Sequence, residues 1–259
     1  MSSNCFVHVN VDINEYFTNQ LPTWCPGCGN FGVLQSLRQA LAELKIAPKE
    51  AVVTYDIGCG GNMVNLLRVC GFATLHGRSV PVAVGAKLAN PKLTVIAQAG
   101  DGGLLNEGAN HLIHAAQRND NITVLLHNNL VFALTAGQTS SVTPVGLATK
   151  STPEGNPYPP LKPLLLTAVA SPKAFLARAF AFDIPKTTAI IKAAIKYQGF
   201  SLVEIMMPCL IWSNNYNQEY FKERIYYPET MPQSYPSLLQ FLEKANDKIP
   251  LGIFWPPKK

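Results

Sequence analysis

The sequence has few charged residues and no long apolar run. Only 14% of its 259 residues are charged, against the roughly 25% of an ordinary soluble domain. We therefore expect another subunit to cover much of the surface. The longest apolar stretches, such as LLLTAVA and IPLGIFW, are far shorter than the ~20 residues that a membrane-spanning helix needs. We expect no membrane span.

Positive charge is not concentrated anywhere along the chain. The formal net charge is +5, but the absence of a Lys/Arg block argues against binding to nucleic acid. An acidic protein partner would still be mildly attracted to such a surface. The first residues also lack a basic stretch followed by an apolar one, so no signal peptide is expected. We expect a reducing, cytoplasmic location, where disulfides are disfavoured.

Strand and helix patterns alternate along the sequence. This alternation predicts an α/β fold with a doubly wound, mostly parallel sheet. Ligands bind such sheets at the carboxyl ends of the strands, where the glycine-rich turns of this sequence fall. The expected strands span 51–55, 93–97, 122–129 and 201–207, and the expected helices span 31–45, 79–90, 105–118, 187–197 and 234–246.

The length fits either one domain over 1–259 or two smaller domains, and we favour one. Segment 143–163 holds six prolines and two glycines. It is therefore expected to be irregular, and either exposed or laid over another subunit. A linker between two domains is the alternative. A C-terminal extension, 210–259, follows the last expected strand.

Asp101 lies between glycines after the apolar strand 93–97. A carboxylate there can hold a hard divalent cation whose other ligands are phosphate oxygens. After Gly102, 26 residues precede Asn129, which can add a side-chain oxygen, while Val131 can add its main-chain carbonyl. GDG and Asn at this spacing are typical of thiamine-diphosphate enzymes. An ordinary strand-end turn followed by an Asn-rich turn is the alternative.

Four of the six cysteines follow a pattern. One pair forms a CxxC motif, which zinc knuckles, redox dithiols and iron–sulfur sites share. Two more cysteines follow expected strands, so all four can meet at one sheet edge and bind a cubane iron–sulfur cluster or a structural zinc ion. Cys5 and Cys70 are interpreted as buried or incidental thiols. The four are Cys25, Cys28, Cys59 and Cys209.

A nearby thiamine site favours iron–sulfur over zinc. An electron carrier beside a carbanion-stabilising cofactor is suited to oxidation of an acyl group in one-electron steps. A zinc ion at the cysteines would add only stability. A nicotinamide-binding domain is disfavoured, because GCGGNM lacks the full GxGxxG pattern.

Sequence words in a fixed order span nearly the whole chain. They are WCPGCGNFG, DIGCGGN, LHGRSVPVAVGAKLANP, GDG, EGANHLIHAAQRN, NNLVFALTAGQTS, KSTPEGNPYPP, the PC of 208–209, and IPLGIF. In both words and spacing the sequence closely resembles the β subunits of 2-oxoacid:ferredoxin oxidoreductases, particularly the branch that includes 2-oxoglutarate enzymes.

The resemblance implies a thiamine-diphosphate-binding domain of the diphosphate-binding type, with three cofactors: thiamine diphosphate, Mg²⁺ and a [4Fe-4S] cluster. The four patterned cysteines would ligate the cluster, and Asp101, Asn129 and the Val131 carbonyl would hold Mg²⁺. The cofactor would be lined by Ile57, Gly58, Cys59, Gly60, His76, Gly102, Gly103, Ala133 and Leu134.

Three polar residues become candidates for catalysis. His76 would hydrogen-bond cofactor or substrate, unless local backbone satisfies it. Arg78 would meet a substrate carboxylate, unless it pairs with a structural one. Asn62 stands where some relatives carry a lysine that reaches the substrate. Which 2-oxoacid is used therefore stays open.

Other positions also depart from the family pattern. Gly103 replaces the second Asp of the frequent GDGD, Phe132 and Ala133 replace Tyr and Gly, and Ala136 stands where relatives have Gly or Lys. The Gly103 change removes a carboxylate near the metal but leaves backbone that can still approach the cofactor. Phe132 lacks the hydroxyl of tyrosine but keeps the bulk of the side chain.

The resemblance implies oxidative decarboxylation of a 2-oxoacid to acyl-CoA and CO₂, with electrons passing through the cluster to ferredoxin. An α subunit, with a pyrimidine-binding domain and a fused γ part, would supply a missing catalytic carboxylate, so the chain would be active only with that partner. One alternative is a non-redox thiamine decarboxylase or synthase component whose cysteines bind zinc or nothing. Another is a degenerate, non-catalytic scaffold subunit.

Overall fold

A seven-stranded sheet forms the centre of the computed structural model, which describes residues 11–213, 216–244 and 248–256. Its order is β11-β7-β8-β4-β3-β1-β2, and every neighbouring pair is parallel except β11 with β7. The predicted mostly parallel α/β fold is therefore confirmed. The strands are β1 (Ala51–Tyr55), β2 (Cys70–Ala73), β3 (Thr94–Gly100), β4 (Thr123–Asn128), β7 (Phe175–Phe180), β8 (Ser201–Met206) and β11 (Gly252–Trp255).

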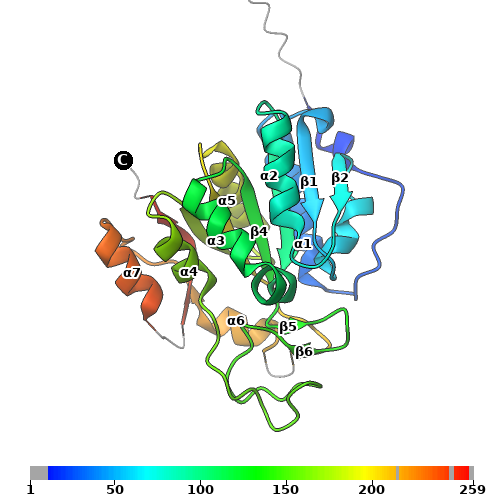
Figure 1. The fold of residues 1–259 in the computed structure, drawn as a ribbon. Helices are drawn as coiled ribbons and strands as arrows, with labels where there is room; N and C mark the ends of the chain where they lie inside the picture. Colours follow the sequence, from blue (N-terminus) through cyan, green and yellow to red (C-terminus); the bar gives the residue numbers. More distant parts are fainter. Residues whose placement is uncertain (1–10, 214–215, 245–247, 257–259) are drawn as a thin grey trace, which may run out of the picture.

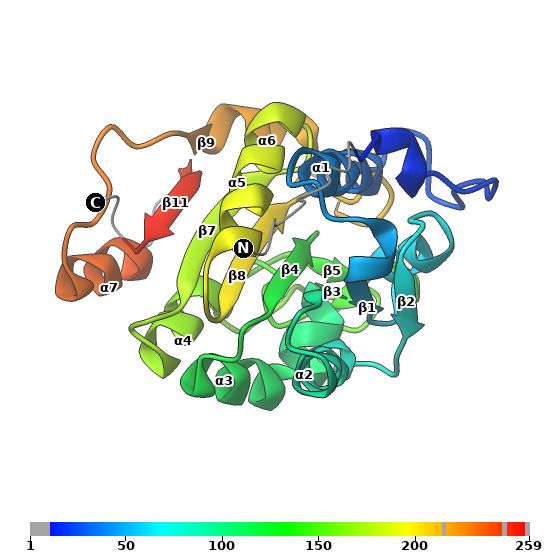
Figure 2. The same ribbon diagram turned by 90° about the horizontal axis from the view of Figure 1, so that it is seen from above.

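Helices cover both faces of this sheet (Figures 1 and 2). Helices α1 and α5 pack together on one face, and α2, α3 and α4 lie along the other. The sheet is thus doubly wound. The α-helices are α1 (Gly29–Glu43), α2 (Ser79–Ala89), α3 (Ala109–Arg118), α4 (Pro163–Ala170), α5 (Ile184–Lys196), α6 (Gln218–Arg224) and α7 (Tyr235–Glu243).

Short elements complete the chain. Two small two-stranded sheets stand apart from the main one, and short helical turns precede α1 and β1 and follow β1 and β3. The small sheets pair β5 (Val131–Phe132) with β6 (Gln138–Thr139), and β9 (Ile225–Tyr226) with β10 (Ile249–Pro250). The turns are η1 (Ile13–Tyr16), η2 (Pro48–Glu50), η3 (Gly60–Asn65) and the π-helical η4 (Gly102–Glu107).

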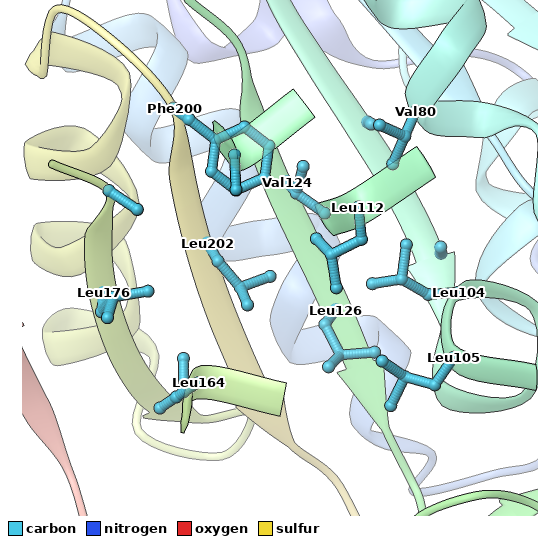
Figure 3. Close-up of a cluster of buried hydrophobic side chains, with 14 of the residues drawn as sticks. Val80, Leu104, Leu105, Leu112, Val124, Leu126, Leu164, Leu176, Phe200 and Leu202 are labelled. Carbon is cyan, nitrogen blue, oxygen red and sulfur yellow. The ribbon is translucent and has the colours of Figure 1, made fainter. Parts of the chain in front are cut away.

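The core is divided by the sheet into two apolar clusters. Along β4, Val124 and Leu126 point into one cluster and Leu125 into the other, since successive side chains of a strand alternate between faces. Figure 3 shows the first cluster, in which Phe200 and Leu112 pack beside β4. Burial on both faces explains why the central strands appear in the sequence as continuous apolar runs.

The strand order reverses between β1 and β3. From β1 the chain moves outward to β2, and from β3 it moves the other way to β4. The loops at the carboxyl ends of these two strands diverge and leave a crevice, which is where doubly wound sheets bind ligands. The loop 56–60 and the turn 100–103 begin at this point.

The predicted helix 105–118 is wrong in one respect, because the structure has two helical segments. The π-helical turn η4 ends at Glu107, and α3 starts after Gly108. Gly108 packs closely against Gly77, since a Cβ at 108 would lie 2.8 Å from the Gly77 carbonyl oxygen. The close contact between the two backbones accompanies the break.

Other expectations need smaller corrections. The predicted helix 234–246 ends at Glu243, and residues 245–247 lie outside the described residues, as does Cys5. Of the two interpretations of Cys70, a buried thiol is excluded, because it is exposed on β2, the edge strand of the sheet, and an incidental thiol remains. Strands β2, β7 and β11 of the main sheet are absent from the expected strands.

The proline-rich segment 143–163 is irregular up to Pro163, where α4 begins. It is nevertheless tied to itself, because the Asn156 side chain donates to the Thr143 carbonyl at 2.7 Å. Tyr158 remains 70% exposed. Beyond α6, β11 pairs antiparallel with β7, so the end of the described chain joins the main sheet. Within the described residues, no helix combines the length and apolar character needed to cross a membrane.

Candidate functional site

One cavity opens at the reversal point of the sheet. All nine residues expected to line the cofactor line it, and so do the three expected to hold Mg²⁺. Their loops leave β1, β3 and β4, and the turn before α2 adds one side. The structure thus brings together Ile57, Gly58, Cys59, Gly60, His76, Gly102, Gly103, Ala133, Leu134, Asp101, Asn129 and Val131.

Asp101 is only 1% exposed. Its Oδ1 accepts the Asn129 N–H at 3.3 Å, and its Oδ2 accepts a hydrogen bond from the Ser140 hydroxyl. Burial raises the pKa of the Asp101 carboxyl to about 7, partly offset by these hydrogen bonds. A divalent cation beside the carboxylate would stabilise its ionised form and reverse this shift.

The turn that carries Asn129 is held from behind by a buried polar chain. The Asn128 amide donates to Glu204 at 2.7 Å, and Arg178 donates to the other oxygen of Glu204 at 2.8 Å. The Asn128 side-chain oxygen in turn accepts the Leu130 N–H at 3.2 Å. Leu130 has a φ of 71°, a strained conformation that persists only where neighbours enforce it.

The oxygen donors of this edge fit a hard cation. Asp101 offers a carboxylate, Asn129 an amide oxygen and Val131 a carbonyl, which are the ligand types that Mg²⁺ prefers. The chain also approaches closely here, because a Cβ at Gly102 would lie 2.3 Å from the Phe132 ring. The Phe132 ring thus fills this space, as expected for a residue that replaces a tyrosine.

The four patterned cysteines line a second hollow, of about 270 Å³. Trp24 and Trp212 also line it. This cysteine hollow and the cofactor cavity are adjacent, since six residues belong to both. These shared residues are Asn30, Cys59, Asn129, Ala133, Leu134 and Met207.

Local hydrogen bonds bring the cysteine segments together. The Cys28 N–H donates to the Cys25 carbonyl at 3.0 Å, and Gly27 adopts a φ of +81° within that turn. The Trp24 indole donates to the Cys59 carbonyl at 2.6 Å. Three sections of chain, far apart in sequence, thus surround one hollow once Cys209 is included.

Cys209 is also linked by hydrogen bonds to the turn that carries Asn129. Its N–H donates to the Ser213 hydroxyl oxygen at 3.2 Å, and that hydroxyl donates to the Asn129 carbonyl at 2.9 Å. One serine therefore joins the cysteine hollow to the cofactor cavity.

The four thiols influence one another electrostatically. Burial and the charges of the other three cysteines together raise the pKa of Cys59 to about 11. The pKa of Cys28 is raised by burial and by Cys209 and Cys25. A bound metal centre would stabilise the thiolates and reverse these shifts. No three His, Cys, Asp or Glu side chains of the described residues are grouped so as to hold a single metal ion.

The three residues expected to be catalytic occupy different places. His76 lines the cofactor cavity, and its Nδ1 lies 3.4 Å from Glu107 Oε1. Arg78 is absent from the cavity lining and donates to the Glu107 main-chain carbonyl at 3.0 Å. Asn62 lines the cysteine hollow instead, where its amide donates to Thr23 at 2.9 Å.

The remaining departure from the family pattern lies in the turn between β5 and β6. Ala136 has a φ of 81°, in the left-handed region that favours glycine. Of the Gly or Lys that the family resemblance leads us to expect at this position, glycine would suit that conformation, whereas the alanine of this chain is strained there.

The structure also adds polar residues that sequence reasoning missed. His127 is buried in the cavity wall, and burial lowers its pKa to about 4, so the ring is neutral. Its Nδ1 lies within hydrogen-bond distance of Asn30 Oδ1, at 2.9 Å. Asp56, 2% exposed, directly follows β1. Its position at a strand end is the same signal that identified Asp101.

Comparison with known proteins places this geometry in a family. The family described as "Thiamine pyrophosphate enzyme, C-terminal TPP binding domain" matches residues 56–205. The 2-oxoacid:ferredoxin oxidoreductase subunit beta of Saccharolobus solfataricus is 38% identical over 247 residues, covering 90% of this chain and 81% of that protein. Subunit beta of 2-oxoacid:ferredoxin oxidoreductase 2 from Aeropyrum pernix is 38% identical, covering 93% and 82%.

A solved structure shares the fold. The 2-oxoglutarate:ferredoxin oxidoreductase of Magnetococcus marinus, determined with 2-oxoglutarate, coenzyme A and succinyl-CoA bound, superposes with a TM-score of 0.92 at 30% identity. The match covers 98% of this chain and 88% of that one. The predicted thiamine-diphosphate-binding fold is thereby confirmed. The chain belongs to the β subunits of the 2-oxoacid:ferredoxin oxidoreductases.

Proposed function

We propose that this β subunit serves an enzyme that oxidatively decarboxylates a 2-oxoacid to acyl-CoA and CO₂ and passes the electrons to ferredoxin. The observation that supports this function best is the shared wall of two sites. Oxygen donors typical of a Mg²⁺-diphosphate site line the cofactor cavity, and four thiols line the adjacent hollow. Two adjacent sites of this kind suit a reaction whose electrons leave one at a time.

Each site has named residues in this proposal. Asp101, Asn129 and the Val131 carbonyl would hold the Mg²⁺ that accompanies the diphosphate of the cofactor. The four patterned cysteines ligate one [4Fe-4S] cluster. Such a cluster has a separate iron atom for each thiolate, so its ligands need not converge on a single ion. When bound, thiamine diphosphate stabilises a carbanion and the cluster carries electrons.

His76 remains the candidate for contact with cofactor or substrate. Its ring lies in the cavity lining beside Glu107. For Arg78 we propose a different role from the sequence expectation, namely to hold the turn before α2 through the Glu107 carbonyl. Asn62, in the cysteine hollow, is assigned to its wall rather than to the substrate.

The proposal includes an α subunit that completes the site. The cofactor cavity measures only about 40 Å³, against the ~300–1,000 Å³ typical of ligand pockets. Large apolar side chains lie exposed at or near it, including Ile57 at 39%, Leu75 at 77% and Leu134 at 51%. Exposed apolar groups of this kind mark interaction surfaces. The α subunit would cover them and contribute the missing carboxylate.

Two wider proposals accompany the function. We propose that residues 1–259 act as one domain, because β11 joins the main sheet and α7 packs on α4. We also propose that the complex works in the cytoplasm, where a reducing environment keeps thiols free to ligate a cluster.

The direct test is turnover by the purified complex of this chain with its α subunit. Pyruvate, 2-oxoglutarate, branched-chain and aryl 2-oxoacids are assayed with coenzyme A and oxidised ferredoxin, under anaerobic conditions. The proposal predicts that at least one of them supports CoA-dependent ferredoxin reduction. Release of CO₂ without ferredoxin reduction would favour the non-redox alternative. Failure of the complex to bind thiamine diphosphate would favour the scaffold alternative.

A further inference from the structure

Asp56 ties together two loops of the cofactor cavity. Its Oδ1 accepts the Ile57 N–H at 2.8 Å and the Gly77 N–H at 2.9 Å. The first N–H begins the loop that carries Gly58 and Cys59, and the second follows His76. One carboxylate oxygen therefore fixes two segments that line the cavity, although Asp56 itself lies behind the lining.

The second oxygen of Asp56 fills the space beside Gly103. A Cβ at residue 103 would lie 1.8 Å from Asp56 Oδ2, a distance that no pair of non-bonded heavy atoms can adopt. Oδ2 is buried and has no hydrogen-bond partner among the described residues. A side chain at 103 would thus enter the volume that the Asp56 carboxylate occupies.

The electrostatic surroundings of Asp56 include two groups of the site. The pKa of its carboxyl is raised to about 6, chiefly by burial. The hydrogen bonds from the Ile57 and Gly77 N–H groups and the charge of His76 oppose this rise, and Glu107 adds to it. The His76 ring lies beside Glu107, so the Asp56 carboxylate acts on a histidine that already has one acidic neighbour.

We propose that Asp56 is a positioning residue of the thiamine diphosphate site, and that its carboxylate substitutes for one at position 103. The inference rests on the proposed function. It explains why this chain has glycine directly after the GDG motif: the carboxylate that a second Asp would place there arrives from the end of β1. Positions 56 and 103 then form an exchangeable pair, in which one side chain with an acceptor oxygen is needed and two do not fit.

The test compares four versions of the chain, each assembled with the α subunit: wild type, Asp56→Gly, Gly103→Asp, and the double variant. Binding of thiamine diphosphate with Mg²⁺ is measured by calorimetry, and thermal unfolding is measured without cofactor. Each single variant is expected to bind the cofactor at least about tenfold more weakly, as is usual when a supporting partner is lost. The double variant is expected to recover to within about threefold of wild type.

Two further variants sharpen the result. Asp56→Asn keeps the oxygen that accepts both N–H groups, so it is expected to retain cofactor affinity within about threefold of wild type. Asp120→Asn is the matched control, because that carboxylate forms a surface pair with Arg118 at 2.6 Å and such pairs contribute little.

The proposal is overturned if the double variant binds no better than the weaker single variant, or if Asp56→Gly binds like wild type. Should the double variant fail to assemble, the Asn variant decides, since a tenfold loss there contradicts the positioning role. Absence of cofactor binding by the wild-type complex would instead refute the proposed function. The unfolding data would then still show whether the two positions are coupled.

Discussion

Three buried titratable side chains surround one cavity. Burial raises the pKa of Asp56 to about 6 and that of Asp101 to about 7, and it lowers that of His127 to about 4. A fold gains nothing in stability from burying such groups without full partners. Their concentration at the reversal point of the sheet is typical of a functional site.

The Asp56 carboxyl should leave a signature in the pH dependence of stability. Its pKa rises from 3.8 to about 6 on folding, so the folded form binds more protons between these values. Stability therefore falls as pH rises from about 4 to about 6, by up to about 3 kcal/mol. Asp56→Asn lacks this contribution, while its neighbours His76 and Glu107 are the same in both proteins. In urea unfolding at several pH values, the free energy of unfolding of the variant should rise relative to that of wild type as the pH increases from about 4 to about 6. A difference that does not change with pH would contradict the burial of this carboxyl.

The cysteine assignment makes a separate prediction about metal content. Cys25 lines the cysteine hollow, whereas Cys70 is exposed on an edge strand away from it. Cys25→Ser should impair cluster assembly, and Cys70→Ser should leave iron per complex unchanged. Iron analysis of the two variants, purified without oxygen beside wild type, measures this. Equal iron loss in both would overturn the ligand assignment.

At the scale of the element, α1 is fixed by a close contact of Gly32 with the segment after β7. A Cβ at Gly32 would lie 1.9 Å from the Ala181 carbonyl oxygen, whereas one at Gly85 in α2 would meet nothing within 4 Å. Gly→Ala usually stabilises a helix by about 0.5–1 kcal/mol, and Gly85→Ala should do so. Gly32→Ala should instead cost roughly 1–3 kcal/mol, as overpacking does.

Thermal unfolding of the two glycine variants distinguishes them by the sign of the change. Because Cys28 precedes α1 as its N-terminal cap, displacement of the helix in Gly32→Ala should also lower iron content. If both variants gain stability, the packing of α1 is not as described.

Strands β7 and β8 are joined by an ion pair behind the turn that carries Asn129. Arg178 and Glu204 stand directly opposite in register, and the Glu204 side chain is 3% exposed. Glu204→Gln should destabilise the protein by about 3 kcal/mol, because it leaves Arg178 without its carboxylate. Glu223→Gln removes an exposed pair with Arg224 and should cost less than about 1 kcal/mol. If both variants lose the same free energy of unfolding in urea, the buried pair contributes no more to stability than the exposed one.

Sequence patterns predicted elements well wherever one physical signal dominated. Strands β1, β3, β4 and β8 were foreseen because buried parallel strands are apolar runs that end in turns. Strand β7 was not, because Arg178 interrupts its apolar run. That arginine is accommodated by Glu204 on the next strand, a contact invisible in the sequence.

The same distinction applies to the site. Strand-end motifs and family resemblance identified residues whose positions topology alone brings together, such as Asp101 and Asn129. Neither motifs nor family resemblance could predict the direction in which a side chain points. Arg78 and Asn62 lie near the predicted site in sequence but point to a main-chain carbonyl and to Thr23, respectively. The role of Asp56 depends on a contact with Gly103 across 47 positions that no local pattern reveals.

For the molecule as a whole, the low charge and the exposed apolar side chains have one explanation. Only 14% of residues are charged, and large apolar groups such as Leu75 and Leu134 lie exposed. Burial of such a surface against an α subunit would account for both. The isolated chain should therefore show no 2-oxoacid-dependent reduction of ferredoxin, and addition of the α subunit should restore it. Turnover by the isolated chain would refute the shared site.

The most direct measurement is an analysis of iron, acid-labile sulfide, zinc and thiamine diphosphate in the complex purified without oxygen. The account predicts iron and sulfide in equal amounts, corresponding to a [4Fe-4S] cluster ligated by this chain, together with bound thiamine diphosphate. Comparison of wild type with Cys25→Ser separates this cluster from any that the partner holds. Zinc in place of iron, with no difference in iron between the two preparations, would contradict the account.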